Sequence, residues 1–506
     1  MVSRTVKLLC VLPFALGTGA CQRAGSDDSA DPPARSLAAV TSRDDDGHLR
    51  FDRDGREERD EGDDHDGEGF LPPQPGERVR PQRPDEELRG ILHSIDRRHL
   101  EDTVHTLVGF GTRHTLSSQT DPVHGIGAAT RWVEAQLQGY AAQSGGRMTV
   151  ELQTFVQPPS ARIPNPTTIT NVVATLRGSV APDRIYLVSA HLDSRVTDVL
   201  NPDAIEPGAD DDASGVALVL ELARVMATHP SEATLVFTTV AGEEQGLFGS
   251  AFQAAQYKAA GADIQGMFSC DIVGSSTADD GTRDPHTIRL FTEGVPTSET
   301  ANQGAIRRAV GGEVDGPSRE LGRFALSVAQ NEETDMRIRH IYRRDRFLRS
   351  SDHVSYLAQG YPANRFTEPN ENFDHEHQDI RVENNVQIGD LIEFMDFAFL
   401  TRVVKVNAAT MWSLAQGPST PKGVGILTQA LTNASDLVWT ANPEPDLDGY
   451  EVVWRETTES DWTHVIPVGN VTSASFQHFS KDNVFFGVRA VDKAGHHSPV
   501  AFPAPR

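Results

Sequence analysis

Residues 184–194, RIYLVSAHLDS, carry most of the fold prediction, because a strongly apolar run stops abruptly at His191. A short run rich in branched and aromatic side chains favours a buried strand. Comparable runs favour further strands at 171–176, 234–240, 267–272 and 287–291, and helical patterns lie at 88–95, 128–140, 215–228, 247–260, 301–310 and 386–404. This alternation predicts an α/β three-layer sandwich with a mostly parallel central sheet, whose site lies at the carboxyl ends of the strands.

His191 and Asp193 stand directly after the run 185–190. A carboxylate two residues after a histidine can turn back onto the far ring nitrogen, which orients a metal-ligating imidazole. A strand-end histidine beside a solvated aspartate explains the same pair without a metal. The pair alone therefore does not decide between the two interpretations.

Residues 207–217, PGADDDASGVA, place three adjacent acids where an apolar helix begins. Acids at this point can simply cap the helix and complement its dipole. That explains one or two of them, but it does not explain the glycines on either side. Flanking glycines suit a tight loop that presents a carboxylate.

Glu243 and Glu244 follow the run 234–240 within AGEEQG (241–246). Adjacent carboxylates repel each other unless a cation is near. A bound metal ion would offset this repulsion, because one glutamate can bind it while the other takes a proton from the attacking water. An exposed acidic turn is the alternative.

Two further positions complete the pattern: Asp271 ends an apolar run, and His375 opens the tract HEHQD (375–379). Each is weak alone. Together with the three sites above, they supply the mixed nitrogen and oxygen ligands that zinc accepts.

The chain closely resembles the co-catalytic zinc aminopeptidase family, which includes secreted bacterial leucyl aminopeptidases and is related to glutamate carboxypeptidase. The resemblance spans roughly residues 95–400 and rests on the motifs HLDS (191–194), PGADDDASGVA (207–217), AGEEQGLFGS (241–250), Asp271, SDH (351–353) and HEHQD (375–379). It implies two zinc ions bridged by Asp211. His191 and Asp271 would complete one zinc site, and Glu244 and His375 the other.

The same resemblance implies roles for two further acids. Glu243 would be the general base, and Asp193 would be the partner that orients His191. His377 is a rival to His375 as ligand, and the family spacing H-x-x-Q-D to Asp379 favours His375.

The implied activity is that of an aminopeptidase, which removes N-terminal residues from peptide substrates by metal-assisted hydrolysis. Alternatives are a carboxypeptidase or a glutaminyl cyclase on the same fold, or a non-catalytic adhesion or receptor protein. The last alternative is disfavoured because every ligand position and the base are occupied.

Arginines near the matching motifs depart from the family pattern. Arg349 and Arg365 suggest a pocket that favours an acidic or carboxylate-bearing substrate side chain. Pairing of these arginines with local acids such as Asp345 or Glu368 explains them equally well. Comparing cleavage of N-terminal Leu and Glu substrates separates the two.

From about residue 416 the helical pattern gives way to short alternating strands. Trp439, GYEVVW (449–454) and VFFGVRAV (484–491) resemble a fibronectin type III domain over 416–506. An all-β, immunoglobulin-like sandwich without chemistry of its own is therefore expected after a zinc peptidase domain at 85–410.

The N-terminus predicts a signal peptide at 1–21. Arg4 and Lys7 precede an apolar stretch, 8–16, that is too short to span a bilayer, and small residues precede Cys21. This order is similar to a bacterial lipoprotein cleavage site, with a lipid anchor on Cys21. An exported bacterial protein is expected, as an outer-membrane lipoprotein or in secreted or periplasmic form, with no membrane span.

The composition of the chain argues against one class of binding partner. The net charge of -26 and pI near 5.0 argue against nucleic acid, which requires a basic face. Residues 22–84 are rich in Asp, Arg, Gly and Pro and poor in large apolar residues, which predicts a disordered acidic linker or pro-segment. Cys270 is the only cysteine after Cys21, so no disulfide is expected in the mature chain.

Overall fold

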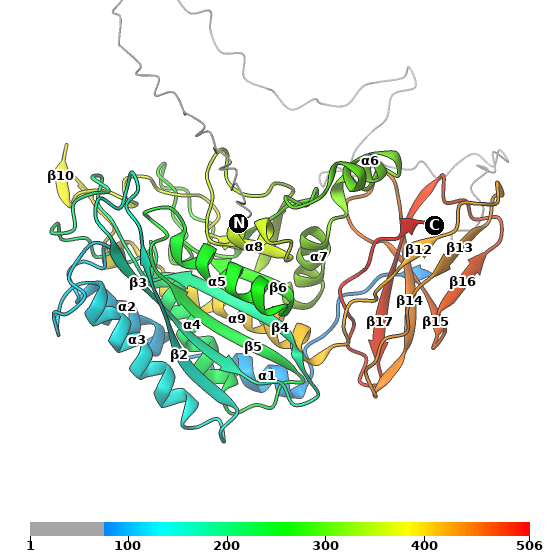
Figure 1. Cartoon of the computed structure of the whole chain (residues 1–506), viewed down its shortest axis with the longest axis horizontal. Coiled ribbons are helices and arrows are strands. Elements are labelled where there is room, and N and C mark those ends of the chain that lie inside the picture. Colours follow the sequence, from blue (N-terminus) through cyan, green and yellow to red (C-terminus); the bar gives the residue numbers. More distant parts are fainter. Residues whose placement is uncertain (1–74) are drawn as a thin grey trace, which may run out of the picture. The chain divides into compact units, whose positions relative to one another are not determined.

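The computed structural model describes residues 75–506, so the predicted signal peptide and the linker up to residue 74 lie outside the described residues. An eight-stranded mixed sheet is the centre of the larger part of this chain (Figure 1). From edge to edge, its strands are β2 (Met148–Gln157), β3 (Thr167–Leu176), β5 (Ala233–Val240), β4 (Ala181–His191), β6 (Asp263–Cys270), β9 (Ala363–Thr367), β7 (Thr287–Thr292) and β8 (Arg337–Ile341).

The four central strands β5, β4, β6 and β9 are parallel, as the alternating pattern predicted. All eight residues of β5 are buried, as expected for a strand that is covered on both faces. The flanking strands are less regular: β3 pairs antiparallel with β2 and β5, and β7 pairs antiparallel with β9. The α/β fold class is confirmed, with a sheet that is mixed rather than mostly parallel.

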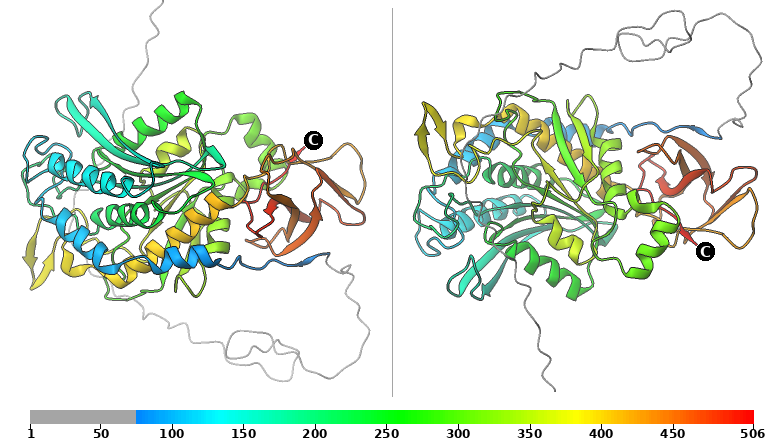
Figure 2. Two further views of the ribbon diagram at one scale, coloured as in Figure 1. Left: turned by 90° about the horizontal axis from the view of Figure 1, so that it is seen from below. Right: turned by 90° about the horizontal axis from the view of Figure 1, so that it is seen from above.

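Helices cover both faces of the sheet, which gives three layers (Figures 1 and 2). Adjacent residues of β4 show the division: Tyr186 and Val188 pack into one apolar cluster, and Leu187 packs into the other. The helices are α1 (Glu86–His93), α2 (Arg97–Val108), α3 (Ile126–Ala141), α4 (Ala213–Met226), α5 (Phe248–Ala260), α6 (Ala301–Ala309), α7 (Pro317–Ala329), α8 (His353–Ala358) and α9 (Phe397–Gln416). The first cluster includes residues of α4, α7 and α9, and the second includes residues of α5 and α8.

The helix predicted over 386–404 is wrong in its first half. Val386–Ile388 form strand β11, which pairs with β10 (Arg381–Glu383) in a separate hairpin. Helix α9 begins only at Phe397, because the carboxylate of Asp396 caps it by accepting from the backbone N–H groups of Ala398 and Phe399. The apolar pattern before Asp396 therefore belongs to a turn and a hairpin.

A β-sandwich follows α9, and its core includes Trp439, Tyr450, Trp454 and Phe486. One sheet has the order β1 (Glu77–Arg78), β15 (His464–Gly469), β14 (Leu447–Glu456) and β17 (Val484–Asp492), and the other has β16 (Ser473–Phe476), β13 (Ser435–Val438), β12 (Gly425–Ile426) and β18 (Ala504–Pro505). No helix within residues 75–506 is long and apolar enough to cross a bilayer.

The segment 75–84 is ordered, which corrects its assignment to a disordered linker. Its strand β1 adds to the edge of β15, with Glu77 opposite Val465. The indole N–H of Trp454 donates to the carbonyl of Pro75 at 2.7 Å, and the N–H of Val79 donates to the carbonyl of Thr463. Such backbone pairing needs no apolar pattern, so composition alone could not reveal it.

His496 lies where this segment enters α1. Its Nδ1 is 2.8 Å from Asp492 Oδ2, and its Nε2 is 3.2 Å from Asp85 Oδ2. The hydrogen bond to Asp492 and the contact with Asp85 raise the pKa of His496 to about 9, although burial opposes this. The folded state therefore holds the proton more tightly than the unfolded chain does.

The stabilisation from His496 should be complete below about pH 6.5, the ordinary histidine value, and lost as the pH rises through about 9. We expect His496→Gln to lower the free energy of unfolding by about 1–2 kcal/mol near pH 6, after allowance for screening at a partly exposed site, and by much less near pH 10. Urea unfolding at both pH values measures this. His105→Gln, at an exposed position of α2, is the matched control; an equal loss at both pH values for His496→Gln would contradict the ionic explanation.

A buried ionic network joins the sandwich to α7. Asp315 accepts hydrogen bonds from Arg323 at 2.7 Å and from Arg455 at 2.7 and 2.9 Å, and the indole N–H of Trp462 donates to Glu320 at 2.8 Å. Removing one partner would leave a buried charge unpaired, which is costly.

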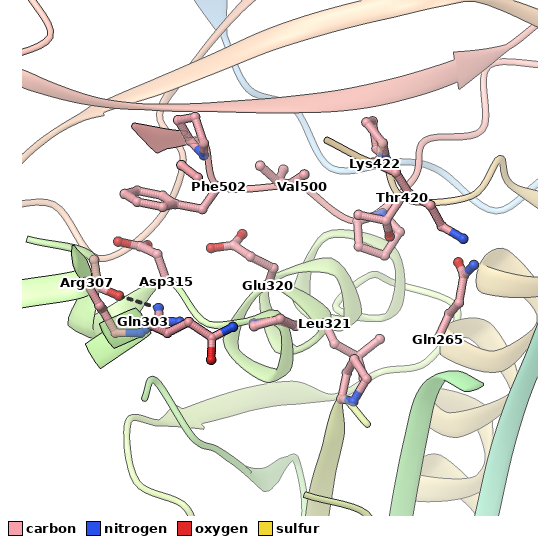
Figure 3. A pocket seen from close by; sticks show the side chains of 18 of the residues that line it. Gln265, Gln303, Arg307, Asp315, Glu320, Leu321, Thr420, Lys422, Val500 and Phe502 are labelled. Carbon is pink, nitrogen blue, oxygen red and sulfur yellow. Dashed lines mark hydrogen bonds between the residues drawn. The ribbon is translucent and has the colours of Figure 1, made fainter. Parts of the chain in front are cut away.

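A cavity of about 550 Å³ lies beside this network, between the helices α6 and α7 and the segment 499–505 (Figure 3). Leu321, Val500 and Phe502 are among its lining side chains, together with Asp315 and Glu320. Within residues 75–506, the two clusters of potential metal ligands lie elsewhere. This apolar cavity is therefore separate from both clusters.

Candidate metal centre

The candidate site forms where parallel strands end side by side. His191 is the last residue of β4 and lies opposite Val240, the last residue of β5, while Asp271 directly follows β6. The loop that carries Asp211 leads into α4 beside these strand ends. Residues far apart in the sequence thus meet at the edge of the sheet where ligands bind in such folds.

Asp211 is shared by two groups of potential ligands. Its Oδ1 is 2.9 Å from Nε2 of His191, which in turn is 3.8 Å from Oδ1 of Asp271. Its Oδ2 is 2.8 Å from Nε2 of His377, which is 2.9 Å from Oε1 of Glu244. In each group the ligand atoms lie within 4.8 Å of one another, and Asp211 belongs to both.

His377 occupies the place at which the family spacing had put His375. The ring of His375 instead stacks on Phe394, with ring centroids 3.5 Å apart, and lines a different cavity. The backbone of His377 has φ 53°, a left-handed conformation that the spacing of the motif could not reveal. The structure brings His191, Asp211, Glu244 and Asp271 together, but not His375.

The backbone of Asp193, rather than its carboxylate, orients His191. The Nδ1 of His191 is 2.9 Å from the carbonyl oxygen of Asp193, whereas the Oδ1 of Asp193 is 3.9 Å away. With the proton on Nδ1, Nε2 is left to present its lone pair to a cation. Asp193 therefore orients His191 as expected, but through its backbone carbonyl oxygen and not through its carboxylate.

The carboxylate of Asp193 instead holds the glutamate turn. It accepts the backbone N–H groups of Glu243 at 3.2 Å and Glu244 at 3.1 Å, and the hydroxyl of Thr115 at 2.8 Å. These contacts fix the direction in which both glutamates leave the end of β5.

Arg195 contacts the second ligand group. Its Nε donates to Glu244 Oε2 at 2.8 Å, and a terminal nitrogen is 2.7 Å from Nδ1 of His377. A guanidinium only donates, so Nδ1 accepts and the ring proton lies on Nε2, between Asp211 and Glu244.

The charges of the site suit bound cations. Burial raises the pKa of Glu243 well above its ordinary value, and the negative charges of Asp352 and Glu244 add to this rise. Burial also opposes ionisation of Asp211, but contacts with His377 and His191 hold its pKa well below the ordinary value. An ionised, shared carboxylate with histidine nitrogens on both sides is a donor set that fits zinc.

Two buried groups that the sequence did not single out support the Asp211 loop. Asp390 accepts the backbone N–H groups of Asp210 at 2.7 Å and Asp211 at 2.8 Å. The fully buried guanidinium of Arg113 donates to the carbonyls of Leu192 and Gly208, each at 2.8 Å. A Cβ on Gly208, which has φ 52°, would lie 2.8 Å from this guanidinium, which explains why glycine stands there.

Arg365 is fully buried and supports Asp271 rather than lining the cavity. It donates to Asp271 Oδ1 at 2.9 Å and lies 3.4 Å from Asp345. The hydroxyl of Ser351 donates to the other oxygen of Asp271. For Arg365, pairing with local acids is therefore the explanation that the structure supports.

The metal site opens into a cavity of about 250 Å³. The charged residues that line it are Arg162, His191, Arg195, Asp211, Glu243, Glu244, Asp271, Arg346, Arg349 and His377. An α/β sheet with histidines and carboxylates gathered at its parallel strand ends is typical of a metal-dependent enzyme.

Comparison with known proteins identifies the family. A family model described as Peptidase family M28 matches residues 171–387. A probable zinc metalloprotease of Pyrenophora tritici-repentis is 50% identical over 438 residues, which cover 86% of this chain and 90% of that protein. One of Pyricularia oryzae is 51% identical over 437 residues, covering 85% and 87%. The chain belongs to peptidase family M28 and is a zinc metallopeptidase.

Solved structures with a similar fold include the LapA aminopeptidase of Legionella pneumophila, at 18% identity and a TM-score of 0.46, covering 65% of this chain and 74% of that one. A glutaminyl cyclase of Fimbriiglobus ruber has 20% identity and a TM-score of 0.43, covering 63% and 95%.

The fungal origin of the curated relatives overturns the expected location. The prediction of a bacterial outer-membrane lipoprotein, or of a secreted or periplasmic bacterial protein, is wrong. That prediction rested on a few small residues before Cys21, a pattern too short to be specific, and Cys21 lies outside the described residues.

Proposed function

We propose that this zinc metallopeptidase is an aminopeptidase with two zinc ions. His191, Asp211 and Asp271 would hold one ion, and Asp211, Glu244 and His377 the other. The observation that carries the proposal is the carboxylate of Asp211, whose two oxygens face the Nε2 atoms of two different histidines at 2.9 and 2.8 Å.

Zinc, when bound, supplies Lewis-acid polarisation of the scissile carbonyl and acidifies a water molecule. Glu243 lines the same cavity but belongs to neither ligand group. Its carboxylate is thus available to take a proton from the attacking water and deliver it to the leaving amine.

One acid of the metal site, Asp271, can receive the free amino terminus of a substrate. Asp271 is held by Arg365 and Ser351 and lines the cavity, where it can attract an ammonium group. A carboxypeptidase would use the same metals and the same base, so the choice of an aminopeptidase rests on Asp271.

We also propose that residues 416–506 are an accessory module of the fibronectin type III kind. Both groups of potential metal ligands in the described chain lie outside this segment.

Metal removal tests the proposed function. We expect a chelator to abolish hydrolysis of amino-acid anilides, zinc to restore it, and restored protein to contain two zinc ions per chain by elemental analysis. The melting temperature should fall on chelation and recover with zinc, because binding to the folded state alone stabilises it. One zinc per chain would contradict the shared-carboxylate site, and full activity in chelator would contradict the metallopeptidase mechanism.

A further inference from the structure

Four arginines line the cavity at the metal site, and they come from separate parts of the chain. They are Arg162 in the segment between β2 and β3, Arg195 after β4, and Arg346 and Arg349 after β8. The carboxylates of Asp211, Glu243, Glu244 and Asp271 line the same cavity, so it is positive only near arginines that no carboxylate neutralises, and bound zinc would add to the positive charge.

Arg162 has no ion-pair partner within residues 75–506. One of its terminal nitrogens donates to the backbone carbonyl of Glu244 at 2.8 Å, which places the side chain beside a proposed metal ligand but leaves its charge unmatched. Arg162 is itself exposed, so a group that enters the cavity can reach its remaining donors.

Arg349 is only partly neutralised. It pairs with Glu371, but this carboxylate also lies 3.2 Å from Arg289 and 3.2 Å from Arg346. The second partner of Arg349 is Glu376, at 3.4 Å. The side chain of Arg349 is 33% exposed, so a ligand in the cavity can contact it without a rearrangement of the protein.

We propose that this cavity binds a carboxylate of the substrate next to the scissile bond, with Arg162 and Arg349 as its partners. This inference rests on the proposed aminopeptidase function and specifies its substrate class. Guanidinium groups bind carboxylates through paired, charge-assisted hydrogen bonds. The carboxylate can be the acidic side chain of the N-terminal residue or the α-carboxylate of a dipeptide.

Two matched substrate pairs distinguish these sources. The anilides of Glu and Gln differ only in side-chain charge, and the dipeptide Gln-Gly differs from its amide only in the α-carboxylate. We expect kcat/KM to favour the acid by about tenfold or more in one pair, the effect of one charge-assisted hydrogen bond. Preference for the Glu anilide identifies the side chain as the source, and preference for free Gln-Gly identifies the α-carboxylate.

The variants Arg162→Gln and Arg349→Gln should each reduce that preference by about tenfold. Arg343→Gln is the matched control, because Arg343 is exposed on the loop that carries Arg349 but does not line the cavity. Glutarate binding to the zinc-loaded protein, measured by calorimetry, needs no turnover and should weaken by a similar factor in both variants but not in the control.

A preference below about threefold in both substrate pairs, or glutarate binding that neither variant weakens, would overturn the carboxylate site. If none of these substrates is hydrolysed, the proposed aminopeptidase function fails instead, and glutarate binding alone decides the carboxylate site.

Discussion

The substitution Asp211→Asn should abolish hydrolysis and release the bound zinc. An amide has one neutral oxygen, so it cannot replace a carboxylate whose two oxygens face two histidines. Loss of the metals removes several kcal/mol of charge stabilisation in the transition state, and about 4 kcal/mol corresponds to a loss of roughly 10³-fold in rate. Zinc content by elemental analysis and anilide hydrolysis measure both effects.

Asp203→Asn is the matched control, because Asp203 is exposed in the same connection between β4 and α4. It should retain full zinc content and full activity. A variant Asp211→Asn that still binds two zinc ions would show that Asp211 is not the shared ligand.

The substitution Glu243→Gln should slow hydrolysis by about 10²–10⁴-fold without loss of zinc. Glu243 lines the cavity but lies outside both ligand groups, so the amide removes the proton acceptor and leaves the ligands in place. Single-turnover kinetics together with zinc analysis separate a slow chemical step from a missing metal.

The neighbouring residue provides the contrast. Glu244 Oε1 is 2.9 Å from Nε2 of His377, so Glu244→Gln should lose zinc as well as rate. If the two variants exchanged these outcomes, the roles of the two glutamates would have to be exchanged too.

The sequence predicted those site residues whose positions depend only on where a buried strand ends. An apolar run followed at once by a polar residue marks the end of a buried strand, and parallel strands bring such ends to one edge. His191 and Asp271 follow this rule, Glu244 lies in the turn just after β5, and the structure places all three around Asp211. The antiparallel edge strand β2 was missed, because only Met148 of its ten residues is buried, and half-buried and exposed residues at a sheet edge carry a weaker signal.

The sequence could not predict contacts that depend on the path of a loop. His375 and His377 differ by two positions, and the left-handed backbone at His377 decides which ring reaches Asp211. Asp390 reaches the Asp211 loop from about 180 positions away, and Arg113 reaches it from about 95 positions away. Neither belongs to a local pattern, so only the folded chain reveals them.

The pairing of β1 with β15 limits how the chain can be shortened from its N-terminus. A cut before Pro75 would leave the Trp454 contact and the added strand intact. A cut after Arg78 would remove the edge strand β1 from the sandwich. The backbone of Val465 and its neighbours would then be unpaired and could pair with strands of other molecules. A shortened chain that keeps this edge covered therefore has to begin at or before Pro75.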